Sequence, residues 1–165
     1  MSTIDYAKAR EVMVEQQIRP WDVLDPRVLD VLEIGTGSGF LAACLGRLAR
    51  EVVSIERRAD LADAARANLA AEGVGNVNVI TADAFSWENS RRFAAICVTG
   101  AVAAIPTRFI EWLQPDGRMF IVRGRSPAME AVLVRNASGS PRIESVFETD
   151  LPYLAGAAPA PTFEL

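Results

Sequence analysis

Residues 31–40 read V-L-E-I-G-T-G-S-G-F and are followed directly by L-A-A-C-L-G-R-L-A-R. Apolar residues lead into three glycines at alternate positions, and Leu41, Leu45 and Leu48 then recur on one helical face. A strand, a glycine-rich turn and a helix in this order bring backbone N–H groups and a helix N-terminus close to a ligand. This stretch therefore predicts the ligand-binding turn of an α/β protein.

The spacing of the glycines narrows the type of ligand. Nicotinamide-binding turns follow G-x-G-x-x-G, which would need a glycine where this chain has Phe40. Here the spacing is G-x-G-x-G, through Gly35, Gly37 and Gly39, and the acidic Glu33 precedes it. That combination suits a ligand without a pyrophosphate. A glycine-rich turn that binds no ligand is the alternative.

Two further acidic residues follow the turn at informative positions. Glu56 ends the apolar run V-V-S-I, about twenty residues past the first glycine, where a carboxylate accepts hydrogen bonds from ribose hydroxyls. Asp83, in V-I-T-A-D-A-F, follows the next strand-like run and is placed to accept from an adenine amino group. The alternatives are a solvated Glu56 beside Arg57 and Arg58, and an Asp83 that only forms a turn.

Strand-like and helix-like segments alternate on both sides of these residues. Alternation of this kind needs crossover helices over a parallel sheet, so the chain is predicted to be an α/β protein with helices on both faces of a mostly parallel sheet. A hairpin at the C-terminal end adds antiparallel strands at one edge. The expected strands are 51–56, 77–83, 94–100, 118–124 and the hairpin 129–136 with 142–150, and the expected helices are 58–73 and 105–117.

The two ends of the chain differ from this single domain of residues 1–165. Residues 1–30 are expected to form a helical arm, and the Ala- and Pro-rich residues 155–165 an extended tail. Asp25 and Pro26 predict a helix over residues 26–32, whereas the glycine turn needs a strand over residues 29–34. Either the helix signal is overridden, or residues are missing between the arm and the turn.

The composition excludes several chemistries. The chain has 165 residues and no His, so it has no Ser-His-Asp triad, no Cys-His pair and no His-ligated zinc site. Its two cysteines, Cys44 and Cys97, lie in apolar runs and indicate reduced core residues in a cytoplasmic protein. No metal site, secretory signal or membrane span is expected. The net charge of −4 disfavours binding of nucleic acid through a broad basic face.

The motifs E-I-G-T-G-S-G-F, Glu56 and T-A-D-A-F resemble the S-adenosylmethionine-binding motifs of the Rossmann-like methyltransferases. More narrowly, the chain resembles the bacterial form of the protein-L-isoaspartate O-methyltransferase family. The stretches that carry this resemblance are M-V-E-Q-Q-I-R-P-W-D-V-L-D-P-R-V-L (13–29), A-I-C-V-T-G-A-V-A-A-I-P (95–106), W-L-Q-P-D-G-R-M-F-I-V-R-G (112–124) and E-T-D-L-P-Y-L (148–154).

The resemblance implies a Rossmann-like methyltransferase sheet, S-adenosyl-L-methionine as cofactor, and methyl transfer to the free carboxylate of L-isoaspartyl residues in damaged proteins or peptides. It also implies the site. Glu33 orients the turn or the ligand's amino group, and Thr99 and Gly100 form the pocket floor, although Thr99 could simply cap its strand. The remaining expected contacts are Gly35, Gly37 and Gly39 for the methionine moiety, Glu56 for the ribose, and Asp83 and Ala84 for the adenine. Thr36, Ser38 and Arg57 are expected to bind the cofactor as well.

The chain departs from the family in one place. In that family several tens of residues lie between the N-terminal helices and the strand before the glycine turn, and they carry a Ser or Thr next to the transferred methyl group. Here V-L-D-V-L-E-I-G joins the two directly. We therefore expect a missing segment near residues 30–33 and assign no catalytic residue.

Two other functions stay open. A related methyltransferase could act on RNA or a small molecule, but the acidic charge balance disfavours RNA. In addition, V-T-G-A stands where amino-methylating families have an aromatic-proline motif such as N-P-P-Y. A protein that binds the cofactor without transferring its methyl group is favoured if the junction near Leu32 is continuous.

Overall fold

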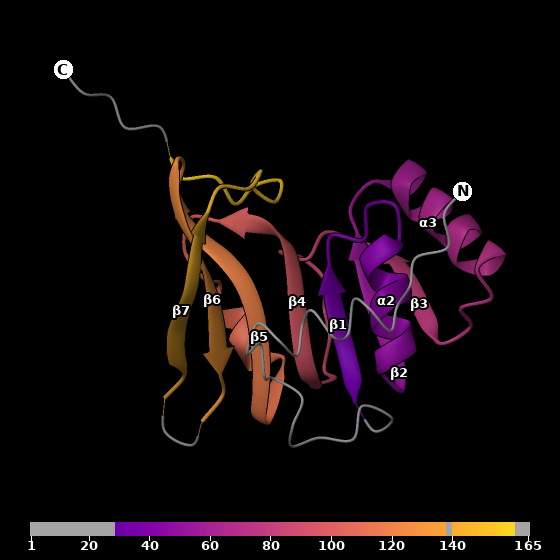
Figure 1. The fold of residues 1–165 in the computed structure, drawn as a ribbon, viewed down its shortest axis with the longest axis horizontal. Helices are drawn as coiled ribbons and strands as arrows, with labels where there is room; N and C mark the ends of the chain where they lie inside the picture. Colours follow the sequence, from indigo (N-terminus) through magenta and orange to yellow (C-terminus); the bar gives the residue numbers. More distant parts are fainter. Residues whose placement is uncertain (1–28, 138–139, 161–165) are drawn as a thin grey trace.

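A computed structural model describes residues 29–137 and 140–160 of the chain. In this part, seven strands form one sheet in the order β3-β2-β1-β4-β5-β6-β7 (Figure 1). The strands are β1 (Asp30–Ile34), β2 (Glu51–Glu56), β3 (Val77–Thr81), β4 (Phe93–Val102), β5 (Leu113–Arg125), β6 (Ala128–Arg135) and β7 (Arg142–Thr149).

Strand pairing confirms the predicted class. The four neighbouring pairs from β3 to β5 are parallel, and β6 and β7 add two antiparallel pairs at one edge. β1 lies between β2 and β4, so that Val31 is opposite both Val52 and Ala95. The chain reverses its direction of travel across the sheet at β1, and the carboxyl ends of β1 and β4 therefore meet at the point where open α/β sheets bind ligands.

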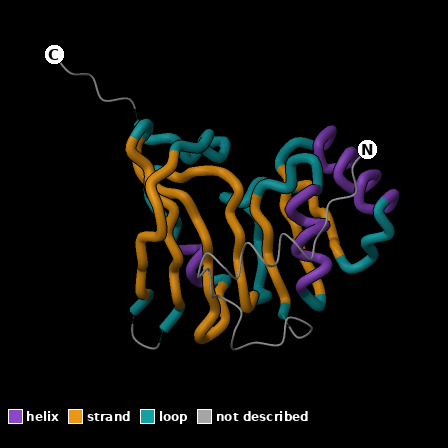
Figure 2. Tube along the Cα trace, viewed as in Figure 1, coloured by secondary structure: helices purple, strands orange, loops and turns teal. Residues whose placement is uncertain are grey.

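Helices cover both faces of the sheet, as predicted. Leu29 and Val31 pack with Leu45 of α2 on one face, whereas Leu32 and Ile34 pack with Phe109 of α4 on the other. The two longer helices lie beside one another over the β1–β3 part of the sheet (Figure 2). The described helices are α2 (Phe40–Leu48), α3 (Ala59–Ala71) and α4 (Thr107–Glu111), and none of them is long and apolar enough to cross a membrane.

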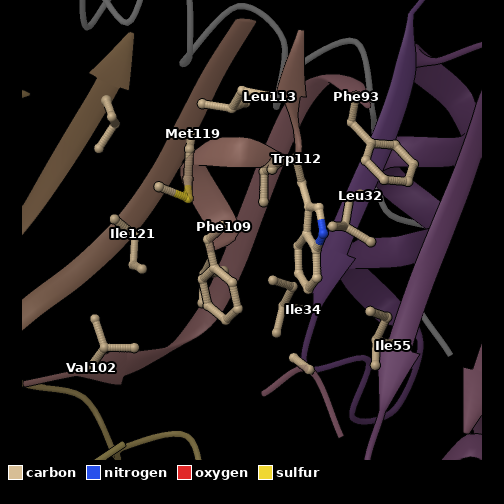
Figure 3. Close-up of a cluster of buried hydrophobic side chains, with 14 of the residues drawn as sticks. Leu32, Ile34, Ile55, Phe93, Val102, Phe109, Trp112, Leu113, Met119 and Ile121 are labelled. Carbon is tan, nitrogen blue, oxygen red and sulfur yellow. The ribbon is translucent and has the colours of Figure 1, made fainter. Parts of the chain in front are cut away.

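The largest buried cluster lies between the sheet and α4. Phe109 is fully buried there and stacks on Trp112 with 5.4 Å between the ring centroids. Figure 3 shows Phe109, Trp112 and Ile34 converging in this cluster. Ile34 of β1 and Ile55 of β2 belong to the same cluster, so packing fixes the ends of the two strands from which the neighbouring turns begin.

The predicted helix over residues 26–32 is wrong for residues 30–32, which belong to β1. A capping signal contributes about 1 kcal/mol. Placing residues 30–34 between two strands instead satisfies their backbone groups on both sides and buries Val31, Leu32 and Ile34. Most of the predicted N-terminal arm, residues 1–28, lies outside the described residues.

The helix predicted over residues 105–117 is also too long. It begins after Pro106, as expected, but ends at Glu111, and Leu113 already starts β5. Asp116 has a left-handed backbone with φ of 60°, and its N–H donates to the carbonyl of Asn136. Pro115 and Gly117 therefore lie in an irregular start of β5 that pairs with the end of β6, rather than simply ending a helix.

We predict that Phe109→Ala lowers the free energy of unfolding by about 3–5 kcal/mol, because it removes a fully buried ring and leaves a cavity. Chemical denaturation followed by circular dichroism measures this change. Val146→Ala on β7, where the native side chain is 47% exposed, is the control and should change stability by less than about 1 kcal/mol. An equal loss in both variants would contradict the central role of Phe109.

Candidate functional site

A cavity of about 310 Å³ opens at the carboxyl ends of β1, β2, β3 and β4. Seven of the twelve residues predicted for the site line this cavity, together with the apolar side chains of Ile34 and Ile55. The seven residues are Gly35, Gly37, Glu56, Arg57, Asp83, Ala84 and Thr99. The topology thus brings together the three turns that follow β1, β2 and β3, as the sequence predicts.

The glycine turn needs residues without a side chain at two positions in particular. Gly35 has φ of +97°, and a Cβ there would lie 2.3 Å from the hydroxyl oxygen of Thr99. Gly39 has φ of +82°, and its Cβ would lie 3.1 Å from the Cβ of Ala65 on α3. The backbone is therefore held close to β4 on one side and to α3 on the other.

Glu56 connects the end of β2 to the glycine turn. Its carboxylate accepts hydrogen bonds from the backbone N–H of Gly37 at 2.9 Å and from that of Arg58 at 3.0 Å. Glu56 is only 8% exposed and lines the cavity. Because each carboxylate oxygen accepts more than one hydrogen bond, the same side chain keeps acceptor capacity for hydroxyl groups of a ligand.

Asp83 forms a turn and also lines the cavity. Its Oδ1 accepts a hydrogen bond from the backbone N–H of Phe85 at 2.9 Å, and its Oδ2 lies 3.6 Å from the Nε of Arg57. The turn-forming role is therefore present, and it fixes the carboxylate at the cavity wall beside Ala84. The contact of Asp83 with an adenine amino group stays a prediction.

Glu33 supports the glycine turn from beneath instead of lining the cavity. It is fully buried and accepts a hydrogen bond from the hydroxyl of Ser54, whose oxygen lies 2.5 Å from that of Thr36 in the turn. Burial raises the pKa of Glu33 to about 7; the hydrogen bond from Ser54 opposes this shift, and the negative charge of Glu56 adds to it. Glu33 and Thr36 thus form a buried polar chain with Ser54 below the turn.

Ser38, Gly39 and Gly100 also lie around the turn without lining the cavity. The carbonyl of Ser38 accepts a hydrogen bond from the side-chain amide of Asn68 on α3 at 2.9 Å. Gly39 is the N-cap of α2. The hydroxyl of Thr99, which does line the cavity, donates to the carbonyl of Gly35 at 2.7 Å, and the neighbouring Gly100 is buried below Leu154. Thr99 therefore ties the end of β4 to the turn.

Residues 151–157, here termed the C-terminal strap, complete the cavity and were not predicted to belong to it. Tyr153, Leu154 and Ala155 line its wall. The strap runs parallel to the end of β4: the N–H of Ala101 donates to the carbonyl of Pro152, and the N–H of Leu154 donates to the carbonyl of Ala101, both at 2.9 Å. The stretch E-T-D-L-P-Y-L carries part of the family resemblance, so it was the feature of the sequence that could have identified the strap.

The wall of the cavity combines charged groups of both signs with apolar surface, which fits an organic ligand with hydroxyl groups. Glu56 and Asp83 supply carboxylates, and Arg57 and Arg58 supply guanidinium groups. The apolar surface comes from Ile34, Ile55 and Leu154. Within the described part of the chain, no group of three or more His, Cys, Asp or Glu side chains is placed to hold a metal ion.

Comparison with known proteins shows which protein family the chain resembles. The family model described as protein-L-isoaspartate(D-aspartate) O-methyltransferase matches residues 12–150. A protein-L-isoaspartate O-methyltransferase of Nitrobacter winogradskyi is 43% identical over 131 residues, which are 78% of this chain and 60% of that protein. One from Methanoregula boonei is 47% identical over 122 residues, 70% of this chain and 55% of that protein. The chain thus spans little more than half the length of these curated relatives.

Solved structures agree on the fold. A Plasmodium falciparum protein described as a protein-L-isoaspartate O-methyltransferase, solved in complex with S-adenosyl-L-homocysteine, superposes with a TM-score of 0.71 at 17% identity, covering 90% of this chain and 72% of that one. A second protein-L-isoaspartate O-methyltransferase also gives 0.71, at 24% identity over 78% of this chain and 43% of its own. The sheet is therefore of the Rossmann-like methyltransferase type, as predicted.

We predict that the free energy of unfolding falls between pH 5 and pH 8 because of Glu33. Its pKa rises from 4.5 to about 7 on folding, so within this window the folded protein retains a proton that the unfolded chain has lost, and the shift corresponds to a loss on the order of 3 kcal/mol as pH rises. Glu33→Gln should remove this pH dependence. Urea denaturation of both proteins at pH 5 and pH 8 measures it.

Glu72→Gln, at an exposed position past the end of α3, is the control and should retain the wild-type pH dependence. The same fall in stability in Glu33→Gln as in the wild type would show that Glu33 is not the titrating group.

Proposed function

The chain belongs to the protein-L-isoaspartate(D-aspartate) O-methyltransferase family, and on this premise we propose that it binds S-adenosylmethionine and methylates the free carboxylate of L-isoaspartyl residues in damaged proteins. The observation that carries the proposal is the placement of Glu56. Its carboxylate is fixed at the cavity wall by hydrogen bonds from Gly37 and Arg58. This arrangement presents an acceptor for ribose hydroxyls beside a glycine turn too narrow at Gly35 for any side chain.

The residues of the cavity divide among the parts of this cofactor. Glu56 and Arg57 are proposed to contact the ribose, Asp83 and Ala84 the adenine, and the turn around Gly35 the methionine moiety. The Plasmodium falciparum relative was solved with S-adenosylhomocysteine, the demethylated form of the same cofactor. When bound, S-adenosylmethionine supplies a methyl group on a positively charged sulfur, and the carboxylates of Glu56 and Asp83 are among the groups of the cavity wall that would hold it.

In this reaction the protein positions the two reactants and excludes water from them. Ile34, Ile55 and Leu154 provide an apolar wall, and the hydroxyl of Thr99 holds the turn against β4. A carboxylate acceptor is already ionised at neutral pH, so attack on the methyl group needs no general base. This agrees with a chain that has no His. The rate enhancement then comes from aligning the acceptor with the methyl group.

A cofactor-binding homologue without transfer activity is the second candidate. The observation that favours it is the sequence V-L-D-V-L-E-I-G, in which the family's intervening segment does not precede β1. We propose that a segment is missing near residues 30–33 and that with it the hydroxyl next to the transferred methyl is lost. A methyltransferase acting on RNA or a small molecule is not favoured by any contact in the cavity.

The two cysteines support a cytoplasmic location for this activity. Cys44 and Cys97 are both free thiols in the structure. Burial, together with the negative charge of Glu33, raises the pKa of Cys97 to about 12, so that it stays protonated and unreactive at neutral pH.

Methyl transfer is tested by incubating the protein with methyl-labelled S-adenosylmethionine and an isoaspartyl peptide, with the matching aspartyl peptide as control. We expect label on the isoaspartyl peptide only, released as methanol in mild base because the product is an ester. Label that resists base would indicate a different acceptor. Calorimetric binding of S-adenosylhomocysteine without any transfer would establish the second candidate.

Glu56→Gln should weaken binding of S-adenosylhomocysteine by about tenfold or more, since a charge-assisted hydrogen bond contributes roughly 1.5–3 kcal/mol. The same change weakens the contacts that hold Gly37 and Arg58. Isothermal titration calorimetry measures the dissociation constant. Glu88→Gln, at an exposed position of the β3–β4 connection outside the cavity lining, should bind as the wild type does. Unchanged binding in Glu56→Gln would argue against the ribose role.

A further inference from the structure

A second cavity, of about 490 Å³, lies at the same rim of the sheet as the first and has no part in the proposed cofactor site. It is bounded by the loop that follows β4 and by the rim ends of β5, β6 and β7. Its lining joins the apolar Ala104 and Ile105 to the charged Arg123, Glu130 and Glu148. Apolar residues come mainly from the loop, and charged residues come from the strands.

The charged residues form a row across three strands. Arg123 and Glu130 are opposite one another in the β5–β6 register and make an ion pair at 2.7 Å. Glu130 is in turn opposite Glu148 on β7. Hydrogen bonds from Arg123 and Ser145 hold the pKa of Glu130 below its usual range, so this carboxylate is charged at neutral pH. Two carboxylates against one guanidinium leave the cavity with a negative charge.

The end of β4 separates the two cavities. Thr99 lines the first cavity, and Ala103 to Ile105 line the second. In Figure 1 the last part of β4 bends over the end of β5, where Ala101 is opposite Val122. The strap links both sides, because Tyr153 lines the first cavity while its hydroxyl donates to the carbonyl of Gly124 in the second, at 3.0 Å.

We propose that this second cavity binds the stretch of polypeptide next to the acceptor residue, with Glu148 favouring a basic side chain at that position. The inference rests on the proposed function, because it takes the acceptor to be part of a polypeptide. An extended peptide has amides that pair with groups such as Arg123 and Glu130, and apolar parts that pack on Ala104 and Ile105. The negative charge of the cavity and of the whole chain favours a basic segment.

The test uses two isoaspartyl peptides that differ only in a lysine or a glutamate beside the isoaspartyl residue. The wild type should bind the lysine peptide more tightly. Glu148→Gln should weaken binding of the lysine peptide by about two- to fivefold, which is the range for an exposed ion pair, and leave the glutamate peptide no weaker than before. Glu144→Gln, on the same exposed strand but outside the cavity lining, is the matched control.

A second variant blocks the cavity sterically. Ala104 is exposed in the loop after β4, so Ala104→Trp fills the groove without entering the core. It should raise the dissociation constant of both peptides, and KM where transfer is measured, and leave that of S-adenosylhomocysteine unchanged. Peptide binding is measured by fluorescence anisotropy with saturating S-adenosylhomocysteine, and therefore does not depend on turnover.

The outcomes separate this inference from the proposed function. Equal peptide binding by the wild type, Glu148→Gln and Ala104→Trp would overturn the cavity's role, even with full methyl transfer. Charge-dependent peptide binding that both variants weaken would support it, even in a protein that transfers no methyl group. Equal weakening by Glu144→Gln and Glu148→Gln would attribute the preference to the overall charge of β7 and would also overturn the proposal.

Discussion

The hydrogen bonds that Glu56 accepts from Gly37 and Arg58 are the contact on which the site depends. Glu56 ends β2, whereas Gly37 belongs to the turn after β1, so a single carboxylate fixes two neighbouring strand ends relative to each other. The first part of the turn is also held by backbone hydrogen bonds, because the N–H groups of Gly35 and Thr36 donate to the carbonyl of Ile55. Glu56 holds the N–H of Gly37, and the Thr99 hydroxyl holds the carbonyl of Gly35, so the turn is fixed from both sides.

The parts of the fold that the sequence predicts well are those in which local pattern and tertiary packing agree. The β-branched run at 51–56 and the helix ending near Gly73 both form where expected, as does the C-terminal hairpin. The predicted helix over 26–32 fails because its cap competes with a strand paired on both sides, and non-local pairing is invisible to a local signal. Helix α4 ends early because β5 takes Leu113 into the sheet.

The site follows the same logic. Gly35, Glu56 and Asp83 meet because parallel strands share one rim, which chain order alone implies. The position of the strap does not follow from chain order in this way. It reaches the turn from more than a hundred residues further along the chain, and it pairs with β4 through a single bridge between Ala101 and Tyr153. Pairing at that distance cannot be deduced from composition. The sequence predicted that Glu33 acts at the glycine turn. Because successive side chains of a strand point to opposite faces of the sheet, the side chain of Glu33 points to the α2 side.

The glycine turn thus lies between two carboxyl groups with different environments. Glu56 is held by two backbone N–H groups at the cavity, whereas Glu33 is buried beneath with a hydrogen bond from Ser54. The charge of Glu56 raises the pKa of Glu33 further. A cation bound in the cavity would offset the charge of Glu56 and so reduce this part of the rise in the pKa of Glu33. Binding of a positively charged ligand in the cavity should therefore be linked to loss of the proton from Glu33.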